Sequence, residues 1–266
     1  MDNSLTRPLA VVTGASNGIG YELAKQFAQN NFDLLVTATG ASIKEAALAF
    51  EQLGAKVLTV EADLATYDGV ETLYSKIKET NRPVEAIAIN AGVGVGGEFV
   101  KTDLKDELNL INLNVVSSVH LAKRVVKDMV ERGNGKILFT SSIAALMPGP
   151  FEAVYAASKA FLHSFSEALR NELKDTGVSI TALMPGPTDT NFFHRADMDS
   201  TKAGAGKKDD PAEVAKQGFQ ALMAGKDDII AGSLKTKMQG NVSKVLPDTV
   251  NAEQHRQLTE PGSANK

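Results

Sequence analysis

The stretch LAVVTGASNGIG, residues 9–20, joins a short β-branched apolar run to a turn with three glycines and then to a helical pattern. Glycine lets the backbone approach a ligand closely and adopt conformations that other residues avoid. The N-terminus of the helix that follows offers unpaired N–H groups and a positive dipole to a phosphate. The stretch therefore predicts a strand, a phosphate-binding turn and a helix, although its glycine spacing is GxxxGxG instead of the GxGxxG dinucleotide fingerprint.

Short apolar runs alternate with longer amphipathic stretches along the rest of the chain. The further runs lie at residues 33–38, 56–62, 85–90, 136–142 and 179–185, and one long helical pattern extends from roughly Leu104 to Glu131. Strands that read as nearly continuous hydrophobic runs between helices indicate a parallel sheet that is covered on both faces. We therefore predict a doubly wound, mostly parallel α/β sheet in a single domain, residues 7–233.

Two segments do not follow this alternation. Residues 187–210 are polar, contain glycine and an aromatic pair, and predict an irregular substrate lid, because long irregular segments inside compact domains are often functional. Residues 234–266 form a C-terminal extension with little apolar material. We expect the end of this extension to be loose.

Composition narrows the classes of partner. The formal net charge of -4 argues against a nucleic-acid or anionic-membrane partner, since both require a basic surface. The chain has no cysteine, which excludes disulfides, thiolate zinc sites and a catalytic thiol, and we expect no metal site. No apolar stretch has the length of a signal-peptide core at the start or of a membrane span farther on, so we expect a cytoplasmic protein.

Several strand ends carry residues suited to a dinucleotide. Asp63 and Leu64 follow the third strand and suit an adenine edge, whereas the small residues of Asn90-Ala91-Gly92 after the fourth would let the backbone approach a ribose. Ligands bind at the carboxyl ends of the strands in such sheets. The glycine turn would add Gly14, Ser16, Asn17, Gly18, Ile19 and Gly20 to the same crevice.

The motif YAASK, residues 155–159, places a tyrosine four positions before a lysine within a helical pattern. Such residues share a helix face, with Cβ atoms about 5–6 Å apart. A nearby positive charge lowers the pKa of a phenol from about 10. We therefore expect the Lys159 charge to lower the pKa of Tyr155 and to bring the phenol towards proton exchange.

The motifs TGASNGIG, NAG, Ser141-Ser142, YAASK and PGPTDT occur in the order in which the short-chain dehydrogenase/reductase family has them. Over residues 8–232 the chain resembles the short, unextended branch of this family. The resemblance implies a Rossmann-like fold and an NAD(P)-dependent oxidoreductase that transfers a hydride between the cofactor and a ketone or secondary alcohol. It also implies a homotetramer or homodimer.

The same resemblance implies catalytic roles. Tyr155 would be the general acid/base, and Lys159 would hold the nicotinamide ribose. Ser142 would be the catalytic serine, in preference to its neighbour. Asn114, with Asn112 as second choice, would hold a water of the proton relay. These residue types suit carbonyl reduction, because the carbonyl oxygen needs both a hydrogen-bond donor and a positioned acid.

Further residues implied by the resemblance would hold the nicotinamide. Pro185 and Gly186 end the sixth strand, and Thr188 matches the residue that bonds the nicotinamide carboxamide, with Thr190 as a competitor.

The end of the second strand decides between the two cofactors. An acid there would prefer the ribose hydroxyl of NAD, and a basic residue the 2′-phosphate of NADP. The chain has neither, but Thr39, Ser42 and Lys44 could bind a phosphate. NADP(H) is therefore favoured, and NAD(H) is possible.

The substrate pocket is predicted to be mainly apolar. Ala144, Met147 and Phe151 follow the strand that carries the serines, and Phe192 and Phe193 lie on the predicted lid. These residues favour a hydrophobic ketone or secondary alcohol as substrate, although packing of the lid would explain any one of them.

Three functions remain open from the sequence. The favoured one is an NADPH-dependent carbonyl reductase, and the second is an NAD-dependent alcohol or hydroxysteroid-type dehydrogenase. The third is a non-catalytic cofactor-binding regulator, because a fold alone does not fix function. A regulator would be expected to lack one of Ser142, Tyr155 and Lys159, and all three are present.

Overall fold

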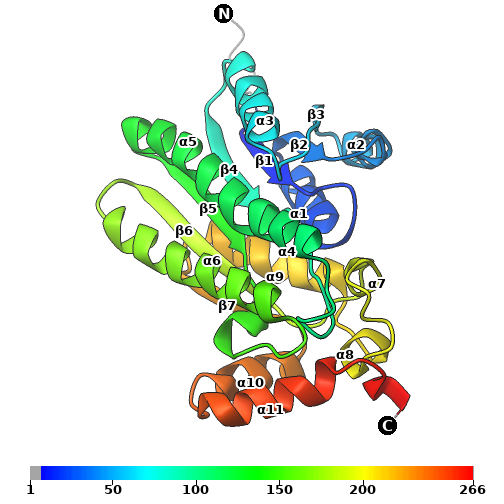
Figure 1. Cartoon of the computed structure of the whole chain (residues 1–266). Helices are drawn as coiled ribbons and strands as arrows, with labels where there is room; N and C mark the ends of the chain where they lie inside the picture. Colours follow the sequence, from blue (N-terminus) through cyan, green and yellow to red (C-terminus); the bar gives the residue numbers. More distant parts are fainter. Residues whose placement is uncertain (1–6, 266) are drawn as a thin grey trace, which may run out of the picture.

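A seven-stranded parallel sheet, in the order β3-β2-β1-β4-β5-β6-β7, forms the centre of the protein (Figure 1). The computed structural model describes residues 7–265. The strands are β1 (Leu9–Thr13), β2 (Asp33–Ala38), β3 (Val57–Glu61), β4 (Val84–Ile89), β5 (Gly135–Thr140), β6 (Val178–Pro185) and β7 (Asp228–Ala231). The predicted doubly wound, Rossmann-like sheet is confirmed, and β7 adds an edge strand that the sequence patterns did not identify.

Helices cover both faces of the sheet. One face carries α1 (Gly18–Gln29), α2 (Ser42–Gln52) and α9 (Pro211–Met223), and the other carries α3 (Tyr67–Glu79), α5 (Ser117–Arg132) and α6 (Ala153–Glu172). Alternate residues of β1 enter different cores: Ala10 and Val12 pack beneath the first set of helices, and Leu9 and Val11 beneath the second. Burial on both faces explains why the strand is apolar at consecutive positions.

The long helix predicted from Leu104 to Glu131 is interrupted near its middle. It consists of α4 (Leu104–Ile111), the π-helical turn η1 (Asn112–Val116) and α5, which ends at Arg132 and is followed by the capping residue Gly133 with a left-handed φ of 73°. Single π-helical turns within α-helices are frequent at functional sites. Here the turn carries Asn114, whose side chain is fully buried.

The C-terminal extension is ordered, which corrects the expectation of a loose end. It contains α10 (Leu234–Ser243), α11 (Asp248–Thr259) and the short turn η3 (Ser263–Asn265), and it covers one end of the molecule (Figure 1). Polar contacts order it: Asn251 Nδ2 donates to the Ser243 carbonyl at 2.9 Å and joins α11 to α10, and Thr259 Oγ1 donates to the Pro150 carbonyl at 2.8 Å and ties α11 to the rest of the chain. Such anchors leave no apolar periodicity in the sequence.

The predicted lid is largely irregular, with two single-turn helices, α7 (Phe192–Arg195) and α8 (Lys202–Ala205). It contacts the C-terminal extension, since α8 packs against α11. Within residues 7–265, no helix combines the length and the apolar character that crossing a membrane requires.

Candidate active site

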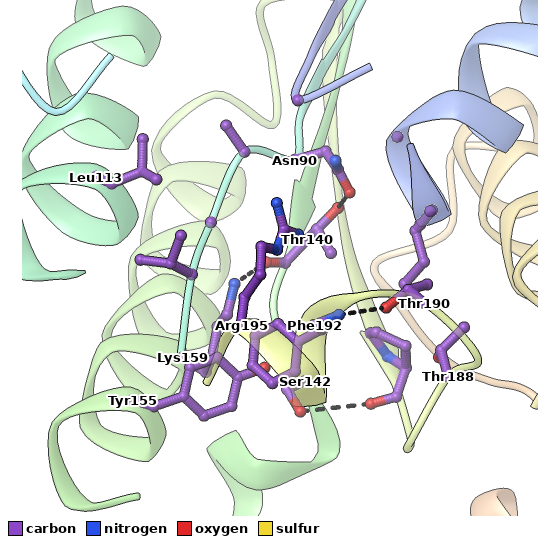
Figure 2. Close-up of a pocket in the computed structure, with 18 of the residues that line it drawn as sticks. Asn90, Leu113, Thr140, Ser142, Tyr155, Lys159, Thr188, Thr190, Phe192 and Arg195 are labelled. Carbon is purple, nitrogen blue, oxygen red and sulfur yellow. Dashed lines mark hydrogen bonds between the residues drawn. The ribbon is translucent and has the colours of Figure 1, made fainter. Parts of the chain in front are cut away.

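A cavity of about 470 Å³ opens at the carboxyl ends of the strands (Figure 2). It spans the boundary between β1 and β4, where the chain reverses its direction across the sheet, and this is the usual ligand position in doubly wound folds. Most of the residues predicted from the sequence line it. They are Gly14, Ser16, Asn17, Gly18, Ile19, Gly20, Thr39, Asp63, Leu64, Asn90, Ala91, Gly92, Ser142, Ala144, Met147, Tyr155, Lys159, Pro185, Gly186, Thr188, Phe192 and Phe193.

The glycine turn is shaped by contact with the end of β4. Gly14 has a φ of 66°, in the left-handed region that favours glycine. A Cβ atom at Gly20 would overlap the Gly14 carbonyl oxygen and the Asn90 side chain. Asn90 Nδ2 in turn donates to the Thr13 carbonyl at 3.1 Å. The GxxxGxG spacing therefore allows the turn to close tightly against the neighbouring strand.

The residues at this end fit a nicotinamide dinucleotide. The N-cap residue Asn17 makes no side-chain capping bond, and the first turn of α1 has no acidic residue, so its N–H groups and dipole suit a phosphate. Farther along the crevice, Gly92 lines the cavity beside Lys159 and Asn114, and the lack of a side chain keeps this narrow space free. A Cβ atom there would lie 3.3 Å from Lys159 Nζ and 3.0 Å from Asn114 Oδ1. A ribose can approach the chain at this point.

The three predicted catalytic side chains meet at the opposite end of the cavity. Tyr155 and Lys159 come from α6, and Ser142 follows β5 (Figure 2). Ser142 Oγ accepts a hydrogen bond from the Ala144 N–H at 3.1 Å and donates to the Pro185 carbonyl at 3.4 Å. These bonds hold the serine hydroxyl near the phenol.

The pKa of Tyr155 moves in the opposite direction to the sequence expectation. Burial raises the pKa of the phenol, the negative charge of Glu152 raises it further, and the hydrogen bond with Ser142 lowers it. Desolvation outweighs the other effects because the side chain lies beneath the lid.

Lys159 is the buried cation of the site. Its Nζ donates to the Thr140 carbonyl at 2.9 Å and lies 5.7 Å from the centre of the Tyr155 ring. Burial lowers the pKa of Lys159 to about 8, because a desolvated ammonium is disfavoured.

Asn114 lies behind the cavity and does not line it. Its Oδ1 accepts the Val93 N–H at 3.0 Å, and its Nδ2 donates to the Val93 carbonyl at 2.9 Å and to Ser158 Oγ at 3.0 Å. It therefore fixes the loop after β4 to α6. The second choice, Asn112, is exposed.

Two other predicted binding residues do not line the cavity. Ser42 is the exposed first residue of α2. Phe151 has a φ of 61°, and its ring stacks with the Arg256 guanidinium at 5.1 Å, so it packs against the C-terminal extension. Both expectations are corrected because strand-end patterns give the position of a residue but not the direction of its side chain.

The predicted lid packs against Tyr155. The rings of Phe192 and Tyr155 lie 5.1 Å apart (Figure 2). Phe193 packs edge-on against Phe192 at 5.5 Å. The loop after β4 accommodates this packing with glycine, because a Cβ atom at Gly94 would overlap the Phe192 ring tip. With Ala144 and Met147, the two phenylalanines form an apolar wall.

Sequence reasoning missed two ionisable residues of the cavity, Glu152 and His255. Both are buried, and Glu152 Oε2 lies 3.1 Å from His255 Nε2. Glu152 could have been found from its position, since it lies three residues before Tyr155 and directly before α6. No sequence signal connects His255 to the site, because it lies in the polar C-terminal extension.

Comparison with known proteins gives a consistent result. Residues 8–201 match the family model for short chain dehydrogenase. The oxidoreductase UcpA from Salmonella typhimurium is 28% identical over 250 residues, which are 93% of each chain. Ketoacyl reductase HetN from Nostoc is 28% identical over 184 residues, and the match spans 69% of this chain and 64% of that protein.

One solved structure is similar to this chain in both fold and sequence. The short-chain dehydrogenase from Sphingobium yanoikuyae, in complex with NADPH, has a TM-score of 0.78 and 27% identity, with 84% of this chain and 87% of that chain covered.

Proposed function

The chain belongs to the short-chain dehydrogenase family, and we propose that it is an NADPH-dependent carbonyl reductase for hydrophobic ketones. It is an oxidoreductase that uses a nicotinamide dinucleotide. The observation that carries the finer proposal is the Ser142 hydroxyl and the Tyr155 phenol, which share one cavity with the buried Lys159 ammonium beneath an apolar lid.

The chemistry proposed for the chain's own residues is proton donation to a carbonyl oxygen. When bound, the nicotinamide supplies the hydride that adds to the carbonyl carbon. Ser142 donates a hydrogen bond to the carbonyl oxygen as negative charge develops there, and Tyr155 gives that oxygen its proton. The raised pKa of Tyr155 keeps the phenol protonated at neutral pH, which suits the reductive direction.

Lys159 and Asn114 support this proton donation by shaping the subsite for the nicotinamide ribose. Lys159 Nζ lies beside Gly92 in the lining of the cavity, where it can bind the hydroxyls of the nicotinamide ribose. Asn114 holds the loop after β4 through both polar groups of Val93, which keeps the floor of this subsite in place. Thr188 and Thr190 both line the cavity near the nicotinamide end, and either hydroxyl can bond the carboxamide.

The preference for NADPH rests on the end of β2. Thr39 lines the cavity there, and β2 ends without the acid that would bind the ribose hydroxyl of NAD. Lys44 contributes less than its sequence position predicts, because its Nζ pairs with Glu61 at 2.7 Å. NAD therefore remains the alternative cofactor, together with an NAD-dependent alcohol or hydroxysteroid-type dehydrogenase as the alternative function.

The domain boundaries are part of the same proposal. Residues 7–233 would form the cofactor-binding and catalytic domain, with residues 187–210 as its lid, and the C-terminal extension from residue 234 would complete the substrate end. In support, His255 and Leu258 of α11 line the same cavity as the glycine turn.

The test is cofactor binding followed by turnover on one sample. NADPH and NADH are titrated by cofactor fluorescence, and a panel of hydrophobic ketones is then added, with a sample that lacks ketone as control. We expect tighter binding of NADPH and ketone-dependent oxidation of it. Binding without turnover would favour the non-catalytic regulator, and tighter binding of NADH would favour the NAD-dependent dehydrogenase.

We also propose that the chain forms a homodimer or homotetramer through α4 and α6. Leu104, Leu108 and Ile111 on α4 and Phe161 on α6 are exposed apolar residues, and α4 packs against α6. A mass in solution that is two or four times the 28.2 kDa of one chain would support this assembly. A monomeric mass would contradict it.

A further inference from the structure

An acid and an imidazole form a buried pair in the wall of the substrate cavity. Glu152 precedes the first residue of α6, and His255 lies on α11. Glu152 Oε2 and His255 Nε2 are 3.1 Å apart, and only 6% and 7% of the two residues are exposed. Both residues line the same cavity as Tyr155.

The pair is not explained by helix capping. Glu152 occupies the N-cap position of α6, but its side chain makes no capping bond and turns instead towards α11. A buried carboxylate requires hydrogen-bond partners, and His255 supplies one. In the part of the chain that the structure describes, Glu152 Oε1 and His255 Nδ1 make no hydrogen bond.

These two atoms are not fully enclosed by the protein. Neither belongs to the fully buried polar atoms without a partner, so each retains contact with accessible space. The cavity is the space that both residues line. An imidazole that donates its Nε2–H to Glu152 has an acceptor at Nδ1, and a carboxylate oxygen is also an acceptor. A ligand group at this point must therefore donate a hydrogen bond.

The residues around Glu152 and His255 affect how well this pair can discriminate between ligands. Its neighbours in the lining of the cavity include the apolar residues Met147, Phe192 and Leu258, together with the polar residues Gln239 and Thr259. A polar group placed in a largely apolar pocket fixes the orientation of a ligand and discriminates against analogues that leave it unpaired.

We propose that Glu152 and His255 form a subsite for a hydroxyl group of the substrate, within two carbons of the carbonyl that is reduced at Tyr155. The inference rests on the proposed reductase function and narrows the substrate class to hydroxyketones. Glu152 lies three residues before Tyr155, and both line the same cavity, so the bound hydroxyl lies close to the reacting carbonyl. The Glu152 carboxylate disfavours an anionic group at the same point.

The test compares ketones that differ only by a hydroxyl or a methyl group. Values of kcat/KM are measured for α-hydroxyacetophenone against propiophenone, and for β-hydroxypropiophenone against butyrophenone. The readout is the ratio within each pair, in the wild type and in Glu152→Leu. Intrinsic reactivity of the ketones cancels between enzymes, and any change in the pKa of Tyr155 cancels within a ratio, because both ketones use the same phenol.

We expect Glu152→Leu to lower the hydroxyketone preference by about 10- to 100-fold for at least one pair, the effect of losing a hydrogen bond to a charged group. The isosteric Glu152→Gln should lower it by a smaller factor, and it decides the question if the leucine variant does not fold. A ratio that neither variant changes would overturn the subsite. Absence of turnover for all four ketones in the wild type, despite cofactor binding, would instead contradict the proposed reductase.

A matched control separates recognition from packing of α11. Asn251 anchors α11 through the carbonyls of Ser243 and Leu246, and it does not line the cavity. Asn251→Ala should loosen the helix yet keep the hydroxyketone preference within about threefold of the wild type. An equal loss of preference in Asn251→Ala and Glu152→Leu would mean that the pair only holds the helix, which also overturns the subsite.

Discussion

Opposing effects act on the pKa of the Tyr155 phenol. Burial beneath Phe192 and the charge of Glu152 raise the pKa of the phenol, and Ser142 lowers it. The result is a phenol that keeps its proton in the absence of substrate. This environment is suited to an acid that acts once negative charge develops on a carbonyl oxygen.

Tyr155→Phe should therefore lower kcat for ketone reduction by about 10²- to 10⁴-fold, the usual contribution of a positioned general acid. Binding of NADPH, measured by cofactor fluorescence, should change little, because the substitution removes only the hydroxyl. Tyr74→Phe is the matched control, since the Tyr74 hydroxyl donates to Asp128 at 3.1 Å away from the cavity. Turnover retained in Tyr155→Phe would contradict the role assigned to the phenol.

Gly20 is a second residue whose identity depends on its immediate contacts. Gly20→Ala places a methyl group against the Gly14 carbonyl, which is backbone and cannot move aside cheaply. We expect a loss of about 1–3 kcal/mol in the free energy of unfolding, typical of overpacking, together with weaker NADPH binding. Gly40→Ala is the control, because a Cβ atom there meets nothing within 4 Å. Equal stability of the two variants in urea titrations would refute the tight turn.

Among the secondary-structure elements, the end of β2 decides which cofactor is preferred. The strand ends at Ala38, and Thr39 follows it into the cavity. Lys44 on α2 pairs with Glu61 on β3, so neither of these charges is free to select the cofactor. The preference at this point therefore depends on the single side chain after the strand.

Thr39→Asp should lower the ratio of NADPH to NADH efficiency by tenfold or more, about 1.4 kcal/mol, because the new carboxylate repels a 2′-phosphate and accepts a bond from a ribose hydroxyl. Leu58→Asp is the control for added charge. It lies on β3, is 53% exposed and does not line the cavity. A ratio that moves equally in both variants, or in neither, would reject the role of Thr39.

For the molecule as a whole, the cavity is closed by segments distant in sequence. The lid covers Tyr155 from one side, and α11 of the C-terminal extension adds His255 from another. The closed site holds Lys159 as a buried cation, and its burial affects the stability of the entire fold. The lowered pKa of Lys159, about 8 instead of the usual 10.5, gives this effect a defined pH range.

Between pH 8 and 10.5 the unfolded chain binds a proton at this lysine that the folded chain has released. The free energy of unfolding therefore rises with pH in this range. Thermal unfolding of the cofactor-free protein should show wild type gaining about 1–2 kcal/mol relative to Lys159→Met between pH 8 and 9.5. Below about pH 7, where Lys159 is protonated in both states, the difference between the two proteins should be constant.

The exposed Lys105→Met serves as the control, and its stability should follow that of the wild type throughout. Parallel curves for the wild type and Lys159→Met across the whole range would mean that Lys159 titrates normally in the folded protein.

The sequence by itself determined the sheet and the cofactor end of the cavity. β1 and β2 begin and end at the predicted residues, because strands buried on both faces are apolar without interruption. The glycine turn, Asn90 and the YAASK helix could also be predicted, since each signal lies within a few consecutive residues.

Only the tertiary structure decided the direction of side chains and the contacts between distant segments. It turned Phe151 away from the cavity, placed Asn114 behind it and brought His255 to Glu152 across 103 positions of sequence. Hydrophobic periodicity records which face of an element is buried, whereas a single polar contact between two elements leaves no periodic trace. The substrate end of this site is built from such contacts, and for that reason only the folded chain reveals it.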